Sequence, residues 1–223
     1  MTLRGYLSTV NKNHCPPDCE FKSKENIGIA LVPPPSNEVF GILISRDPTV
    51  RWLKKYRDIM EANEEESIVR TKLFKTAIPD LLKNRIEKFM GEEIDENDKK
   101  CLFDVISQKV YWTHLHKCFT DASGKESSKF KIENANKCAD RWLEEELNFA
   151  IGDETKFLIA LGKEVQSWVR KWKENKGRDK NIKIIELLHP SGQNNRIWHR
   201  SALKEIKKTE EAIKELIERC KGD

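Results

Sequence analysis

The 223-residue sequence contains no apolar run that approaches the roughly 18 residues of a membrane-spanning helix. Residues 1–13 also lack the apolar core of a secretory signal. These two absences argue against a membrane protein and a secreted one. We therefore expect a cytoplasmic protein with no membrane partner.

The charge balance is nearly even, and no internal repeat is present. Lys and Arg number 41 against 37 Asp and Glu, a net charge of +4 that only weakly indicates a nucleic-acid partner. Hydrophobic residues make up 38% of the chain, enough for a core, and charged residues make up 35%. We expect one domain over residues 1–223, with its core at 14–200 and a C-terminal helix at 201–223.

Short apolar runs alternate with longer amphipathic segments along the chain. β-Branched and aromatic runs predict buried strands at 39–45, 109–115, 156–161 and 182–188. Helical periodicity predicts helices at 50–62, 66–90, 95–107, 132–149, after Gly162, and at 197–220, with Thr49 and Asp95 as caps and Pro79 as a kink or break. This alternation predicts a parallel sheet with helices on both faces.

Two of the predicted strands are followed by side chains that can take part in catalysis. Asp47 and Pro48 follow the strand at 39–45, and His189 with Pro190 follows the strand at 182–188 before a small polar loop at 191–196. Ligands of open α/β sheets bind at the carboxyl ends of the strands. For the segment around His189 alone, an ordinary strand-to-helix turn is an equally good interpretation.

Six cysteines in a chain expected to be cytoplasmic favour metal or redox chemistry over disulfides. Four of them come from three segments and predict a cage for Zn²⁺ or a [4Fe-4S] cluster: Cys15, Cys19, Cys118 and Cys138. The alternative is that all six are incidental buried thiols. Cys101 and Cys220 match no partner and are interpreted as plain helix residues.

Taken in order, several segments of the chain resemble the uracil-DNA glycosylase superfamily and, within it, the iron–sulfur branch. The resemblance lies in the stretches 41–49, 110–118, 138–147 with 157–162, and 189–192, together with Cys15 and Cys19. It spans about residues 14–200. The sequence departs from the pattern at His114, where that branch has an asparagine, and at Ser45-Arg46, where the first motif has glycine.

The resemblance implies a three-layer α/β/α fold with a central, mostly parallel, four-stranded sheet. It also implies a buried [4Fe-4S] cluster, with Zn as the alternative. The implied activity is that of a monofunctional, single-chain DNA glycosylase at the nucleoid that excises a deaminated base, uracil first. Asp47 would stabilise the sugar cation and orient water, and His189 would donate to the base oxygen that gathers charge.

The remaining site residues follow from the same resemblance. Base-binding roles are expected for His114, Arg46 and Pro48, and DNA-binding roles for Ser191, Gly192, Gln193, Asn194 and Arg196. The aromatic residue that stacks on the base is not fixed by the resemblance, and Trp52, Tyr56 and Phe74 are the candidates.

Two other functions are compatible with the sequence. The departures at His114 and Arg46 are also expected in a non-catalytic relative that binds DNA or recognises damage. An unrelated zinc-stabilised α/β protein would explain the cysteines. In either case Asp47 would be a turn or capping residue, and His189 a structural histidine.

Overall fold

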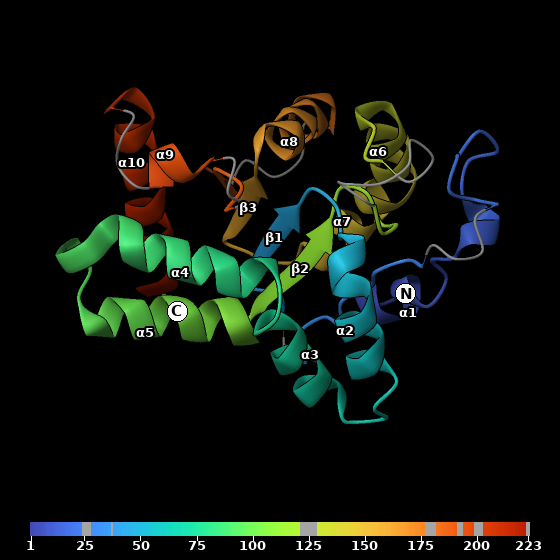
Figure 1. Cartoon of the computed structure of the whole chain (residues 1–223), viewed down its shortest axis with the longest axis horizontal. Helices are drawn as coiled ribbons and strands as arrows, with labels where there is room; N and C mark the ends of the chain where they lie inside the picture. Colours follow the sequence, from blue (N-terminus) through green and yellow to red (C-terminus); the bar gives the residue numbers. More distant parts are fainter. Residues whose placement is uncertain are drawn as a thin grey trace.

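The fold is built on a four-stranded, all-parallel sheet. A computed structural model describes residues 1–23, 28–36, 38–120, 129–176, 182–190, 194–198 and 203–221. The strands are β1 (Gly41–Ser45), β2 (Val110–His114), β3 (Phe157–Leu161) and β4 (Lys183–Leu187), and they lie in the order β2-β1-β3-β4 (Figure 1). The parallel sheet predicted from the sequence is confirmed.

Three of the strands are buried along their whole length because both faces of the sheet are covered. All residues of β1, β2 and β3 are buried. Alternate side chains enter two separate cores: Leu43, Trp112 and Ile159 on one face, and Ile42, Tyr111 and Leu158 on the other. Continuous apolar runs of this kind are typical of parallel strands between two helical layers.

Helices form the two outer layers and complete the expected three-layer α/β/α architecture (Figure 1). One core includes residues from α2 (Val50–Met60), α3 (Glu66–Phe74), α4 (Ile78–Met90), α5 (Glu96–Gln108), α9 (Asn195–Trp198) and α10 (Leu203–Lys221). The other includes residues from α1 (Leu3–Leu7), α6 (Ile132–Cys138), the π-helical turn η4 (Ala139–Leu143), α7 (Glu144–Ala150) and α8 (Lys163–Lys176).

Several predicted helix boundaries are confirmed. Asp95 caps α5, since its side chain accepts a 2.8 Å hydrogen bond from the backbone N–H of Asp98. The helix predicted at 66–90 is broken, and Pro79 lies in the first turn of α4, where its missing N–H costs nothing. Thr49 occupies the N-cap position of α2, but its side chain caps no N–H group.

Other boundaries differ from the predictions. The segment predicted as one helix at 132–149 contains the π-helical turn η4, which begins directly after Cys138 and carries the buried Trp142. Of the helix predicted at 197–220, the structure describes the end of α9 and α10, and residues 199–202 lie outside the described part. Of the charged loop predicted at 174–181, residues 174–176 belong to α8, and 177–181 are outside the described part. Helix α1 was not predicted, since five residues are too few for a periodic signal.

Gly41 begins β1 directly against the ring of Phe157. A Cβ at this position would lie 2.3 Å from Cε2 of Phe157, whose ring is fully buried and packs edge-on against Phe40 at a centroid distance of 5.8 Å. The ring therefore has no free direction in which to move. We expect Gly41→Ala to lower the free energy of unfolding by about 1–3 kcal/mol, measured by urea denaturation.

Gly152 provides the matched control for this substitution. A Cβ built there meets no atom within 4 Å. We expect Gly152→Ala to change the free energy of unfolding by less than about 0.5 kcal/mol. Equal effects at positions 41 and 152 would contradict the packing described for Phe157.

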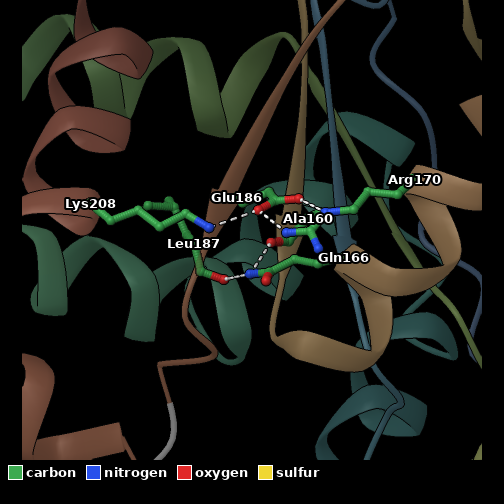
Figure 2. A network of polar contacts seen from close by, with 6 residues as sticks. All are labelled: Ala160, Gln166, Arg170, Glu186, Leu187 and Lys208. Carbon is green, nitrogen blue, oxygen red and sulfur yellow. Dashed lines mark hydrogen bonds and ion pairs between the residues drawn. The ribbon is translucent and has the colours of Figure 1, made fainter. Parts of the chain in front are cut away.

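A polar network holds β4 between α8 and α10 (Figure 2). Arg170 of α8 binds both carboxylate oxygens of Glu186, and Lys208 of α10 lies 3.1 Å from the same carboxylate. The Arg170 guanidinium lowers the pKa of Glu186. Gln166 donates to the carbonyl oxygen of Leu187 at 2.9 Å. The strand that leads to His189 is thereby fixed from both sides.

Candidate functional site

A pocket of about 500 Å³ opens near the carboxyl ends of β1, β2 and β4. Its lining includes Asp47, His114 and His189, together with Arg46 and Pro48. All five were predicted as catalytic or base-binding residues, and they come from three separate strand ends. The structure thus brings the predicted groups to one rim of the sheet.

Asp47 is buried, and each of its carboxylate oxygens has a donor. Arg46 Nε donates to Oδ1, and Thr120 Oγ1 donates to Oδ2. The backbone N–H of Thr120 also donates to the carbonyl oxygen of Pro48 at 2.8 Å. Arg46 itself lies over the ring of Phe130, with 4.3 Å between the guanidinium carbon and the ring centroid. The carboxylate is therefore held in one orientation.

His114 is the last residue of β2 and is only 1% exposed. Neither of its ring nitrogens has a hydrogen-bond partner among the described residues. Burial holds its pKa well below the usual value, and the charge of Lys117 lowers it further. The ring is thus neutral at pH 7, with one donor and one acceptor. An unpaired buried polar group costs about 1–3 kcal/mol, which a ligand in the pocket would recover.

His189 is fixed through its main chain. Its carbonyl oxygen accepts hydrogen bonds from Asn194 Nδ2 at 2.8 Å and Trp198 Nε1 at 3.3 Å. Burial lowers the pKa of His189, the positive charge of Arg46 lowers it further, and Asp47 opposes the shift. Next to it, Gly162 has a φ of +87°, and a Cβ there would lie 3.3 Å from the Cβ of His189. Glycine therefore permits the turn after β3 to lie against this histidine.

Of the three aromatic candidates, only Trp52 lines the pocket. Its Nε1 donates to Thr76 Oγ1 at 3.1 Å, and its ring centroid is 6.3 Å from that of His114. The hydroxyl of Tyr56 is bonded instead to the backbone of Leu31. Phe74 lies under the guanidinium of Arg70 and is not part of the pocket lining.

The predicted DNA-contacting loop is only partly described. Ser191, Gly192 and Gln193 lie outside the described residues, and for Arg196 only the backbone position in α9 is given. Asn194 directs its side-chain amide to the carbonyl oxygen of His189. In this structure Asn194 therefore supports the site from the protein side.

Two residues that contact the predicted site were missed by the sequence analysis. Thr120 binds the Asp47 carboxylate, and Trp112 lines the pocket and donates from Nε1 to Ser45 Oγ at 3.0 Å. No signal could have identified Thr120, because a single threonine in an irregular segment carries no periodicity. Trp112 was recognised only as a strand residue.

A second, much smaller cavity is lined by four cysteines: Cys15, Cys19, Cys118 and Cys138. The backbone N–H of Lys117 lies 3.4 Å from Cys138 Sγ and donates to it. Burial raises the pKa of the Cys138 thiol to about 12, and the neighbouring Cys15 and Cys19 add to the shift. Burial and Cys138 likewise raise the pKa of Cys118.

The four thiols line one small cavity, but they are not placed to hold a single metal ion. Cys101 lies elsewhere, with its Sγ 3.4 Å from the carbonyl oxygen of Cys220. Over the described ranges, no group of three or more His, Cys, Asp or Glu side chains is placed to hold one metal ion. The predicted convergence of four cysteines is observed, and the identity of any bound group is a separate question.

A buried polar network lies beside the four-cysteine cavity, whose lining includes Lys117. Lys117 Nζ is 2.5 Å from Glu146 Oε2 and also donates to Thr113 Oγ1, while the hydroxyl of Tyr111 donates to Glu146 Oε1 at 2.6 Å. These four side chains are almost fully buried. The network ties α7 to β2, the strand that carries His114. Breaking one partner of such a buried pair typically costs about 3–5 kcal/mol.

Among the described helices, none is long and apolar enough to cross a membrane.

Comparison with known proteins gives one family match. No curated protein matches the chain. A family model described as the uracil DNA glycosylase superfamily matches residues 61–217, which include His114 and His189. Asp47 lies upstream of the matched region, so its place in the site rests on the geometry of the pocket.

Proposed function

Since the chain belongs to the uracil DNA glycosylase superfamily, we propose that it is a monofunctional DNA glycosylase that removes a deaminated base, uracil first. The observation that carries this proposal is the single pocket lined by Asp47, His114 and His189. The substrate would be a nucleotide rotated out of DNA into this pocket. We further propose that the protein acts as a monomer in the cytoplasm, at the nucleoid.

Asp47 is proposed to act on the sugar side of the bond. Cleavage of an N-glycosidic bond leaves positive charge on the sugar, and a carboxylate stabilises that charge and orients the attacking water. Donors from Arg46 and Thr120 fix the Asp47 carboxylate. A carboxylate offers about four acceptor sites, so two donors leave room for a water molecule.

His189 is proposed to act on the base side. Negative charge gathers on the oxygen of the departing base, and a neutral imidazole can donate a hydrogen bond to that oxygen. The lowered pKa of His189, caused mainly by burial and then by Arg46, keeps the ring neutral at pH 7. Its main-chain bonds to Asn194 and Trp198 hold the residue in place.

His114 is proposed to contact the edge of the base, with Trp52 as the stacking residue. The unpaired ring nitrogens of His114 can offer a donor or an acceptor. These two atoms lie far apart on the ring, so only one of them can face the base edge. An asparagine amide at this position would make two contacts. The proposed site therefore discriminates less strictly between uracil and other deaminated bases.

The proposal is tested by incubating the protein with oligonucleotides that contain uracil, hypoxanthine or xanthine. We expect strand breaks that appear only after alkali treatment, because a monofunctional enzyme leaves an intact abasic site. Breaks without alkali would contradict the monofunctional assignment. If none of the three bases were released, the enzymatic proposal would be wrong.

A non-catalytic DNA-binding relative is the second candidate, and one observation favours it. The Asp47 carboxylate is already engaged by Arg46 on one oxygen and Thr120 on the other. Such a carboxylate could serve only to shape the pocket. This candidate predicts salt-sensitive DNA binding without release of any base, so the same oligonucleotide assay separates it from the glycosylase.

We propose that the four cysteines hold a [4Fe-4S] cluster, with Zn²⁺ as the alternative. The support for this proposal is that four thiols line one cavity: Cys15, Cys19, Cys118 and Cys138. The N–H group of Lys117 already points at one of the sulfurs. A bound cluster would supply cross-links between the 15–19 segment, the end of β2 and α6, and no electron-transfer step is proposed.

A further inference from the structure

Three basic side chains line the pocket without belonging to the proposed catalytic set. They are Arg51 and Lys55 on α2 and Lys75, the residue directly after α3. All three are exposed, whereas Asp47 and His114 are buried. The three cations therefore lie at the mouth of the pocket. None of them has a hydrogen bond or ion pair with a described residue.

The charge of the pocket lining is unbalanced. The lining includes two carboxylates: Asp47 is bonded to Arg46 and Thr120, and Asp80 accepts from the neutral amide of Asn84 at 3.2 Å. Neither is paired with Arg51, Lys55 or Lys75, so these three positive charges exceed the one negative charge of Asp80. The mouth of the pocket is therefore a site of net positive charge.

Unpaired cations also occur elsewhere on this surface. Lys54 and Arg57 on α2 and Lys88 on α4 are exposed and make no ion pair with a described residue. Position distinguishes Arg51, Lys55 and Lys75, because among the described residues only these exposed, unpaired cations line the pocket. Charge alone does not separate the two groups, so the test compares them directly.

We propose that Arg51, Lys55 and Lys75 bind the backbone phosphates that flank the extruded nucleotide. This inference rests on the proposed function only for the identity of the ligand as DNA. A nucleotide whose base enters the pocket brings its sugar and both neighbouring phosphates to the mouth. Arg51 and Lys55 are four residues apart, so they lie about 6 Å apart along one face of α2. That spacing suits successive phosphates of an extended strand.

The inference assigns to α2 and the end of α3 a role that the sequence did not indicate. The DNA contacts predicted from the sequence lie after β4, at residues 191–196. The basic mouth is formed instead by elements that follow β1. Contacts to phosphate fix register and contribute affinity without reading sequence.

The test compares two triple variants that remove the same charge. One is Arg51→Gln/Lys55→Gln/Lys75→Gln, and the matched control is Lys54→Gln/Arg57→Gln/Lys88→Gln. The probe is a fluorescent duplex with a tetrahydrofuran abasic-site analogue, and the affinity is measured by anisotropy over a series of NaCl concentrations. The slope of log K against log [salt] is negative, and each lost phosphate contact reduces its magnitude by about 0.7–0.9. We expect the magnitude of the slope to fall by about 2–3 for the mouth variant and by less than about 1 for the control.

A second measurement locates the contacts on the DNA. The two phosphates that flank the analogue are replaced by neutral methylphosphonates. The parent protein and the control should lose about tenfold in affinity, and the mouth variant should lose little, because its partner side chains are already absent. Equal slopes for the two variants, an equal loss for all three proteins, or no DNA binding by the parent would each overturn the inference.

These measurements do not depend on catalysis. A protein that releases no base but shows the expected difference in slopes would contradict the proposed activity and support the phosphate contacts. Base release together with indistinguishable slopes would support the proposed activity and contradict the phosphate contacts.

Discussion

Asp47→Asn should lower the rate of uracil excision by about 10²- to 10⁴-fold while the affinity for DNA stays within a few-fold of the parent. The substitution removes the negative charge that would stabilise the sugar cation and keeps the shape of the side chain. The amide oxygen can still accept from Arg46, and the hydroxyl of Thr120 can accept from the amide nitrogen. The site should therefore keep its geometry and lose its electrostatic function.

The measurement is a single-turnover rate on a uracil-containing oligonucleotide, with anisotropy as the binding control. Asp80→Asn is the matched variant, because Asp80 lines the same pocket but is bonded to Asn84. We expect this control to retain nearly the parent rate. Excision by Asp47→Asn at the parent rate would remove Asp47 from the mechanism. Parent and variant that are equally inactive and bind DNA equally would favour the non-catalytic relative.

Cys138→Ser should remove the bound metal and strongly destabilise the protein. We expect the parent, purified without oxygen, to absorb visible light and to contain about four irons per chain if it holds a [4Fe-4S] cluster. Cys138 ends α6, and its sulfur receives the N–H group of Lys117, so it would be an interior ligand. Its loss should cost a large part of the about 10 kcal/mol that a structural metal site can contribute.

Cys101→Ser is the control for this substitution, because Cys101 contacts the backbone of Cys220 and does not line the four-cysteine cavity. It should keep the metal and the colour. Metal analysis and urea denaturation of both variants test the prediction. A colourless parent with one zinc per chain would replace the cluster by the zinc alternative. A parent free of both metals would leave the four cysteines as buried thiols.

The sheet and the position of the pocket could be predicted from the sequence because both depend on local patterns. Continuous apolar runs such as 157–161 indicate strands that are buried on two faces. Once the strands are parallel, their carboxyl ends share one rim. Asp47 and His189 could therefore be expected to lie at one pocket although they are more than 140 positions apart.

The contacts that refine the site depend on tertiary positions and left no trace in the sequence. Glu146 is one of three successive glutamates, and only the phase of the helix after the π-helical turn decides that this one faces Lys117. Thr120 reaches Asp47 because the chain after β2 runs beside Pro48. The basic mouth arises because α2 and α3 pack beside the pocket, which helical periodicity alone does not show.

The strand order sets the distance between the two proposed catalytic residues. Asp47 follows β1 and His189 follows β4, and β3 lies between these two strands. Neighbouring strands are about 4.8 Å apart, so the two strand ends are separated by about 10 Å through main-chain hydrogen bonds. The turn after β3 starts with Gly162, which adds no side chain to the gap. The distance between the two proposed catalytic residues is thus set by main-chain hydrogen bonds, and substitutions of side chains in the pocket lining should leave it unchanged.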